Sequence, residues 1–279
     1  MLVRYFQPSP DLREYVRLFQ LVHLQFSPTD VLPFKPYWPR PENCLAFTPR
    51  DNEIIEEFDG KNRIIKPRAA IIGQPTCVTN RHVGRHCLIF QVVFQTGALF
   101  RLTGIPSHEI CNQIIDAEAI FSKEINLVNE RLSSTDNYDE MTMIIENFLR
   151  YLIKRKGVHS SKDLLPIDKV SHLMFNSSNH SMDILADKAC LSVRQFNRIF
   201  LERTGVSPKV FSRLVRFDKA VLLKNANADK DWLSIALETD YYDYQHLVRD
   251  YKDFTKLTPN GFFEAETKAP ERTFGVKET

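Results

Sequence analysis

The sequence predicts an α+β N-terminal domain, a small antiparallel β-barrel with helices, followed by an all-α C-terminal domain. In the first part of the chain, short apolar segments of strand-like character are separated by turns, as in small barrels and sandwiches. From Pro166 onward the apolar residues recur at helical spacing instead. We therefore place the N-terminal domain at 1–156, a linker at 157–165, the C-terminal domain at 166–264 and a flexible polar tail at 265–279.

Length and composition agree with two domains that each bury a core. The chain has 279 residues, of which 43% are hydrophobic. It contains no apolar run of about 18 residues, the length that a membrane span needs, and no signal peptide at its start. The cysteine count is five, an odd number, without C-x-x-C spacing, which favours reduced thiols. We expect a cytoplasmic protein.

The N-terminal domain should contain several short strands and at least one long helix. We expect a short helix near Ser9 and strands at 17–26, 44–48, 53–58, 69–72, 77–81 and 86–95. Five prolines between 27 and 41 predict a loop there. The segment 138–156 should be an amphipathic helix with a wide apolar stripe. This stripe either packs on the barrel or forms a dimer seam.

The segment 192–208 has the marks of a short helix with defined ends. Ser192 is a good N-cap, and Gln195 three residues later completes a capping box. Gly205 suits the left-handed position that ends a helix, and Ser207-Pro208 begins the next one. The residues expected to face the core are Ile184, Leu185 and Ala189 in the preceding helix and Val193, Phe196, Ile199 and Phe200 in this one. A helix, a turn at 190–191 and a second helix with polar residues outward form a helix-turn-helix pattern.

The same pattern returns 51 positions later. At matching positions of the two units, a cap residue corresponds to a cap residue, a core residue to a core residue, and an outward-facing arginine to an outward-facing arginine. The matched pairs are Ile184 and Ile235, Ser192 and Asp243, Phe196 and Leu247, Arg198 and Arg249, Phe200 and Tyr251, and Ser207-Pro208 and Thr258-Pro259. A duplicated unit is a stronger signal than one amphipathic helix. The segment 208–224 should be a long helix that joins the two units.

Charge is distributed unevenly between the two units. Between Ser192 and Lys224, eight basic residues stand against two acidic ones, a local charge of +6. Such a patch suits the phosphates of nucleic acid. From Asp231 to Lys256, three basic residues stand against six acidic ones, giving −3. We therefore expect the second unit to bind DNA more weakly than the first.

The polar face of each second helix offers groups that read bases in the major groove. Arginine can bond O6 and N7 of guanine, and asparagine or glutamine can bond N6 and N7 of adenine. The expected base contacts are Arg194, Asn197, Arg198, Tyr244, Gln245 and Arg249, with Val248 beside a thymine methyl. Phosphate contacts should come from helix starts and basic side chains. The expected ones are Ser192, Arg203, Ser207, Lys209, Asp243, Lys252 and Thr258.

The C-terminal domain resembles the AraC/XylS family of bacterial transcription regulators. The motifs that carry this resemblance are L-A-D-K-A-C-L-S-V-R-Q-F-N-R-I-F at 185–200, T-G-V-S-P at 204–208 and Y-Y-D-Y-Q-H-L-V-R-D-Y-K-D-F-T-K-L-T-P at 241–259. The resemblance implies sequence-specific binding to double-stranded promoter DNA, with the two recognition helices in successive major grooves. It also implies RNA polymerase as a partner, and a homodimer is possible.

The N-terminal domain is similar to the cupin-like sensor domains that precede such modules. The similarity lies in P-S-P-D-L-R-E-Y-V at 8–16 and F-Q-V-V-F-Q-T-G-A-L-F-R-L-T-G-I-P at 90–106. It implies a small-molecule effector in the barrel. Phe47, Phe90 and Phe94 either line that site or are plain core. The histidines and glutamate of a metal-binding cupin are missing, so we expect no metal, no cofactor and no catalytic residue.

Three alternatives remain. Some relatives join this module to a DNA-repair domain with a zinc-bound, methyl-accepting cysteine, but the cysteines here lack zinc spacing and are better explained as buried thiols. A metal site from His82, His86 and Cys87 would need a helix where the sequence predicts strand and turn. The third alternative is a dimeric DNA-binding protein that senses no effector.

Overall fold

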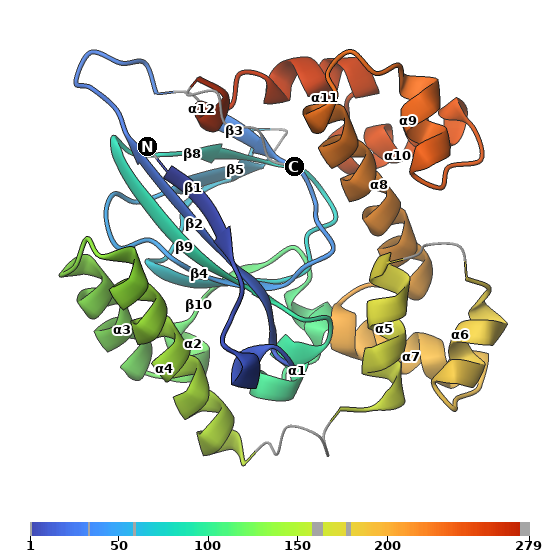
Figure 1. Cartoon of the computed structure of the whole chain (residues 1–279), viewed down its shortest axis with the longest axis horizontal. Helices are drawn as coiled ribbons and strands as arrows, with labels where there is room; N and C mark the ends of the chain where they lie inside the picture. Colours follow the sequence, from blue (N-terminus) through green and yellow to red (C-terminus); the bar gives the residue numbers. More distant parts are fainter. Residues whose placement is uncertain (1, 33, 58–59, 158–163, 177–179, 274–279) are drawn as a thin grey trace.

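The computed structural model describes residues 2–32, 34–57, 60–157, 164–176 and 180–273. A β-rich N-terminal region lies beside a helical C-terminal region (Figure 1). The strands are β1 (Leu2–Phe6), β2 (Val16–Gln25), β3 (Phe34–Tyr37), β4 (Cys44–Phe47), β5 (Ile54–Glu57), β6 (Arg63–Ile65), β7 (Ala69–Ile72), β8 (Thr79–His82), β9 (His86–Phe94) and β10 (Ile114–Asp116). They form two antiparallel sheets, in the orders β1-β2-β9-β4-β7-β10 and β3-β8-β5-β6. The predicted fold class is confirmed.

The loop expected at 27–41 is wrong in part, because this segment contains β3. Its residue Pro36 lies opposite Asn80 of β8. Since β3 is at the edge of the four-stranded sheet, a proline there need not break the ladder. The sequence patterns also missed β1, β6 and β10, while the expected helix near Ser9 is only the 3-10 turn Pro10–Leu12.

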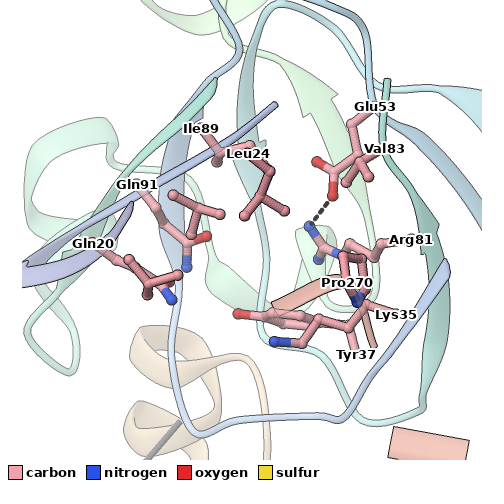
Figure 2. Close-up of a pocket in the computed structure, with 12 residues that line it drawn as sticks. Gln20, Leu24, Lys35, Tyr37, Glu53, Arg81, Val83, Ile89, Gln91 and Pro270 are labelled. Atoms are coloured by element: carbon pink, nitrogen blue, oxygen red, sulfur yellow. Dashed lines mark ion pairs between the residues drawn. The ribbon is translucent and has the colours of Figure 1, made fainter. Parts of the chain in front are cut away.

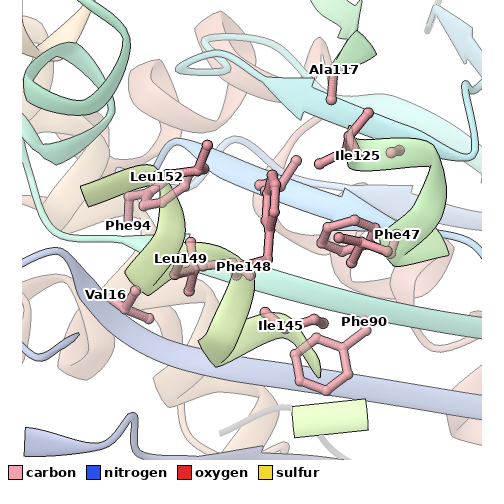
Figure 3. Packing of buried hydrophobic residues seen from close by; sticks show 14 of the residues in the cluster. Val16, Phe47, Phe90, Phe94, Ala117, Ile125, Ile145, Phe148, Leu149 and Leu152 are labelled. Atoms are coloured by element: carbon pink, nitrogen blue, oxygen red, sulfur yellow. The ribbon is translucent and has the colours of Figure 1, made fainter. Parts of the chain in front are cut away.

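One face of the six-stranded sheet carries the main apolar core. It is covered by α3 (Glu124–Ser133) and α4 (Tyr138–Lys156), with α1 (Ala98–Thr103) and α2 (Glu118–Phe121) at its edge (Figure 1). The apolar stripe of α4, including Ile145, Phe148 and Leu149, packs against Phe47, Phe90 and Phe94 (Figure 3). Of the two interpretations of this stripe, packing on the sheet is therefore confirmed. The three phenylalanines are core residues.

The C-terminal region is helical throughout the part that the structure describes. Its helices are α5 (Pro166–Asn176), α6 (Met182–Lys188), α7 (Val193–Thr204), α8 (Pro208–Ala226), α9 (Trp232–Glu238), α10 (Tyr244–Thr255), α11 (Pro259–Glu266) and α12 (Pro270–Thr273). The two helix-turn-helix units are α6-α7 and α9-α10, and α8 runs between them (Figure 1). Most of the expected linker, 158–163, lies outside the described residues.

Three local expectations are corrected. Ile184 and Val193 were expected in the core, but they are 49% and 37% exposed. Both residues lie in the first turn of a helix, and their side chains are only partly covered by the core. Within the expected tail, α11 extends to Glu266 and Pro270–Thr273 form α12, with Pro270 buried, while 274–279 lie outside the described residues.

The two regions share contacts rather than lying apart. Trp38 and Val78 belong to the sheet region by sequence, yet both are buried in the apolar core of the helical region. The backbone N–H of Val78 donates to the carbonyl of Phe254 in α10 at 2.9 Å. Within the residues that the structure describes, no helix is long and apolar enough for a membrane span.

Candidate nucleic-acid interface

Helix α7 presents its polar face to solvent, and its ends are fixed by local bonds. Ser192 and Gln195 form the expected capping box, and Gly205 ends the helix with φ at 93°. Arg194 is exposed, and the Arg198 side chain is 71% exposed with only a 3.9 Å contact to Glu202. The amide of Asn197 donates to the Val193 carbonyl at 2.8 Å, which leaves its oxygen as an acceptor.

Helix α10 repeats this arrangement in the second unit. Asp243 caps it by accepting the backbone N–H of His246 at 2.8 Å. Gln245 and Arg249 are exposed on this helix. Lys256 ends the helix with φ at 64°, a left-handed conformation that Gly205 adopts in the first unit without the strain of a Cβ.

Two further residues near the start of α10 were missed by the sequence analysis. Tyr242 is 88% exposed, and its ring lies edge-on to His246 at 6.1 Å between centroids. By contrast, Tyr244 is half-buried and packs against the core, so it offers less of its ring than expected. The available signal was the tyrosine pair at 241–242 before the cap, since Tyr241 is buried and only Tyr242 can face outward.

The cap residues expected at phosphates are used within their own helices. Ser192, Ser207 and Thr258 each accept a backbone N–H three residues later, at 3.2–3.3 Å. Their side-chain oxygens are therefore engaged in fixing the helix starts, where backbone N–H groups point outward. Lys209 and Lys252 are exposed and can reach a phosphate directly.

Arg203 is the clearest correction among the expected phosphate contacts. Its guanidinium is buried and bonds both carboxylate oxygens of Asp168 in α5, at 2.6 and 2.7 Å. The two side chains are 7% and 1% exposed. A bidentate pair of this kind fixes the end of α7 against α5, and it holds the guanidinium in the interior, away from the exposed face of the helix.

The basic patch of the first unit is also smaller than its +6 charge indicated. Arg213 of α8 pairs with Asp250 at 2.7 Å and also with Asp253, both on α10. Lys224 donates to two backbone carbonyls at 2.6 and 2.8 Å. Arg213 thus joins α8 to the second unit and partly neutralises its acidic excess, whereas Lys224 holds the loop that follows α8.

A narrow cavity that is partly open to solvent lies between the two sheets (Figure 2). One wall comes from alternate residues of the large sheet and is mostly apolar. The charged residues of the opposite wall lie in or beside the small sheet, next to Pro270 of α12. The lining residues are Val3, Gln20, Val22, Leu24, Lys35, Tyr37, Glu53, Arg81, Val83, Ile89, Gln91 and Pro270. Glu53 loses hydration by burial, but Lys66 and Arg81 beside it hold its pKa below the ordinary value. The carboxylate is therefore charged.

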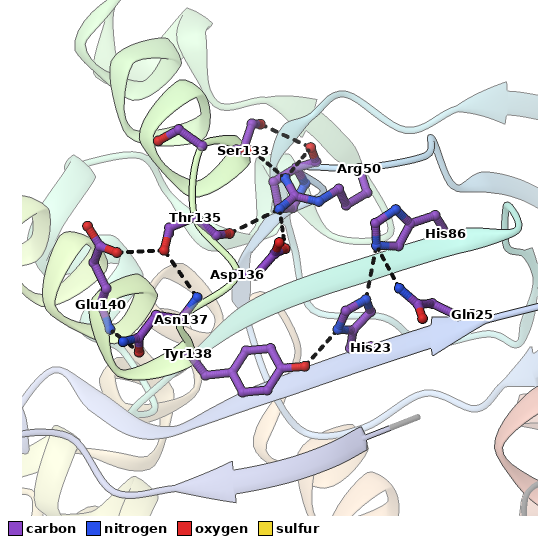
Figure 4. Close-up of polar contacts among 12 residues, drawn as sticks. His23, Gln25, Arg50, His86, Ser133, Thr135, Asp136, Asn137, Tyr138 and Glu140 are labelled. Carbon is purple, nitrogen blue, oxygen red and sulfur yellow. Dashed lines mark hydrogen bonds and ion pairs between the residues drawn. The ribbon is translucent and has the colours of Figure 1, made fainter.

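The histidines expected in a possible metal site are separated. His82 pairs with Glu56 at 2.9 Å on the small sheet. His86 instead faces His23, with 3.0 Å between their Nε2 atoms, and His23 Nδ1 contacts the Tyr138 hydroxyl at 2.7 Å (Figure 4). The ring centroids are 5.2 Å apart, so the two nitrogens point at each other as in an N–H···N hydrogen bond. Burial, followed by the neighbouring His86, lowers the pKa of His23.

The cysteines form no shared site in the part of the chain that the structure covers. Cys44 and Cys87 are buried, as expected, whereas Cys77 is exposed. Burial raises the pKa of the Cys44 thiol well above its usual value. Among the described residues, no three His, Cys, Asp or Glu side chains are grouped to hold a metal ion.

Comparison with known proteins finds sequence matches in the helical region. Residues 185–265 match the family model for a helix-turn-helix domain. An uncharacterized HTH-type transcriptional regulator of Haemophilus influenzae is 33% identical over 78 residues, which are 28% of this chain and 26% of that protein. The match thus spans about a quarter of that relative's length.

Solved structures of ToxT from Vibrio cholerae align over most of the chain at low identity. An apo form covers 89% of this chain and 98% of its own, with 12% identity and a TM-score of 0.49. A form bound to an unsaturated fatty acid covers 98% of this chain and 100% of its own, with 11% identity and a TM-score of 0.48. The sequence match and the two capped units joined by α8 lead to one conclusion: residues 185–265 form a helix-turn-helix domain.

Proposed function

We propose that this protein is a sequence-specific DNA-binding transcription regulator that reads two major-groove segments with α7 and α10. One observation carries the proposal: an exposed arginine recurs at the same position of two capped helices, as Arg198 and Arg249. Both helices pack into one apolar core together with α8. Such a pair suits two successive major grooves on one face of DNA.

The base contacts divide by chemistry. In the first unit, Arg194 and Arg198 suit guanine, while the free oxygen of Asn197 can accept from adenine N6. In the second unit, Gln245 suits adenine and Arg249 suits guanine or a phosphate. Tyr242 and His246 extend this second surface, and Val248 remains a candidate for a thymine methyl. Phosphate contacts come from Lys209, Lys252 and the starts of the capped helices.

The cavity between the sheets is the proposed effector site. Its apolar wall and its charged wall suit a small molecule with a hydrocarbon body and a polar end. We further propose that the regulator acts on promoter DNA in the cytoplasm together with RNA polymerase. A homodimer would use a surface other than the buried stripe of α4.

The test is selection of bound sequences from random double-stranded DNA by the full chain, followed by footprinting. We expect one enriched motif with two protected major-groove segments about one helical turn apart. Arg155→Ala is the control for loss of an arginine outside the recognition helices, because Arg155 is exposed on α4 and pairs with Glu124. This variant should select the same motif as the unmodified chain. Recovery of DNA without any enriched motif would contradict the proposal.

A further inference from the structure

Trp38 links the small sheet to the helix that joins the two DNA-binding units. It directly follows β3, and its side chain is fully buried in the core of the helical region. Its indole N–H donates to a carboxylate oxygen of Asp218 in α8 at 2.8 Å. Its ring also meets Phe262 of α11 edge-on, at 6.4 Å between centroids. One side chain thus touches both α8 and the end of the second unit.

The buried carboxylate of Asp218 is stabilised by the hydrogen bond from Trp38. The Asp218 side chain is 13% exposed, and burial raises its pKa. Arg40 lies 3.8 Å from it and stacks over the Trp38 ring at 4.3 Å. A buried carboxylate that loses a donor is costly, so α8 is held most stably where Trp38 can reach it.

The same strand also forms a wall of the cavity. Lys35 and Tyr37 line it, and Tyr37 precedes Trp38 directly, with the two rings inclined by 22° at 6.3 Å. The Arg81 guanidinium lies 4.1 Å over the Tyr37 ring and 3.6 Å from Glu53. Figure 2 shows these groups gathered on the polar wall, beside Pro270. The cavity wall and the contact to α8 are therefore made by two consecutive residues, Tyr37 at the end of the edge strand and Trp38 directly after it.

We propose that Trp38 is a positioning residue that couples the cavity to α8 and so sets how α7 and α10 meet DNA. The proposal rests on the proposed function, because its readout is operator binding. Helix α8 contacts both α7 and α10. A small displacement of α8 against the sheet region would therefore change the fit of both recognition helices.

The first experiment is a double-mutant cycle on operator affinity, with the full chain and a DNA fragment selected by the unmodified protein. Trp38→Phe keeps an aromatic ring but removes the N–H donor, and Asp218→Leu removes the acceptor. Each should weaken binding about 2- to 30-fold, and the double variant should bind like one single variant, because both remove the same bond. Phe121→Leu is the control: it loosens the core at Phe148, and so lowers the melting temperature, without touching α8.

The second experiment perturbs the cavity without a ligand. Val83 lines the cavity, and Val83→Phe fills part of it. This change should alter operator affinity in the otherwise unmodified chain, and most of the effect should vanish in the Trp38→Phe background. Unchanged affinity in Trp38→Phe, no effect of Val83→Phe, or an equal effect in both backgrounds would overturn the coupling. If the unmodified chain selects no motif, the proposed function fails instead.

Discussion

The buried pair between Arg203 and Asp168 gives the sharpest test of how the first unit is held. Replacing Arg203 with methionine removes both bonds to Asp168 and leaves a carboxylate that is 1% exposed. The backbone N–H of Leu165 still donates to this carboxylate at 2.9 Å. Removing one partner of a buried ion pair typically costs about 3–5 kcal/mol. We expect a loss of this size in the free energy of unfolding.

The assay is urea unfolding followed by helical circular dichroism. Lys209→Met is the matched control, because Lys209 is exposed and its loss should change stability by no more than about 0.5 kcal/mol. The double variant Arg203→Met/Asp168→Leu should recover most of the lost stability, because it removes the unpaired charge as well.

The same variants separate a structural role from a phosphate contact. Operator affinity is measured against salt concentration at a temperature where all variants are folded. Lys209→Met should reduce the slope of log K against log salt by about 0.9, whereas Arg203→Met should leave it unchanged. A stable Arg203→Met protein with a reduced slope would refute the assignment of Arg203 to the core.

Three further predictions concern pH, packing and backbone conformation. Burial lowers the pKa of both His23 and His172, so below the ordinary histidine pKa of about 6.5 the unfolded chain binds more protons and stability falls. In the double variant His23→Gln/His172→Gln, the unfolding free energy should depend less on pH between about 7.5 and 5.5, a range that brackets that pKa. An unchanged pH dependence would show that these two histidines do not cause it. Phe148→Ala should lower the free energy of unfolding by about 3–5 kcal/mol without changing the sedimentation behaviour. A change in oligomeric state would instead indicate that the apolar stripe of α4 forms a dimer interface. Gly205→Ala should destabilise by more than about 1 kcal/mol, because φ is 93° and the new Cβ would lie 3.0 Å from the Ser107 carbonyl; a neutral result in thermal melts would contradict this.

The sequence was most informative where a signal is local. Ser192 with Gln195, and Gly205 thirteen residues after Ser192, set the ends of α7 because capping depends on neighbours in the chain. The long apolar stripe of 138–156 predicted α4 within its observed bounds. The repeat at 51 residues then made the second unit recognisable although its charge differs.

The sequence was least informative where the outcome depends on partners far along the chain. Arg203 and Arg213 look like exposed helical arginines, and only the fold brings Asp168 and Asp250 to them. The strand β3 was missed because prolines usually mark loops, and only an edge position permits one there. Trp38 likewise has no local signal for its contact with Asp218, which is 180 residues away.

The central claim is that two matched helices read DNA, and the direct test is the sequence preference of Arg198→Ala and Arg249→Ala. Each variant is compared with the unmodified chain on the selected motif and on single-base variants of it, at one salt concentration. We predict a loss of about 1–3 kcal/mol for each lost base contact. For each arginine, specificity should relax at one base position, and the two positions should lie in different halves of the motif. Unchanged affinity and unchanged base preference in both variants would contradict this prediction.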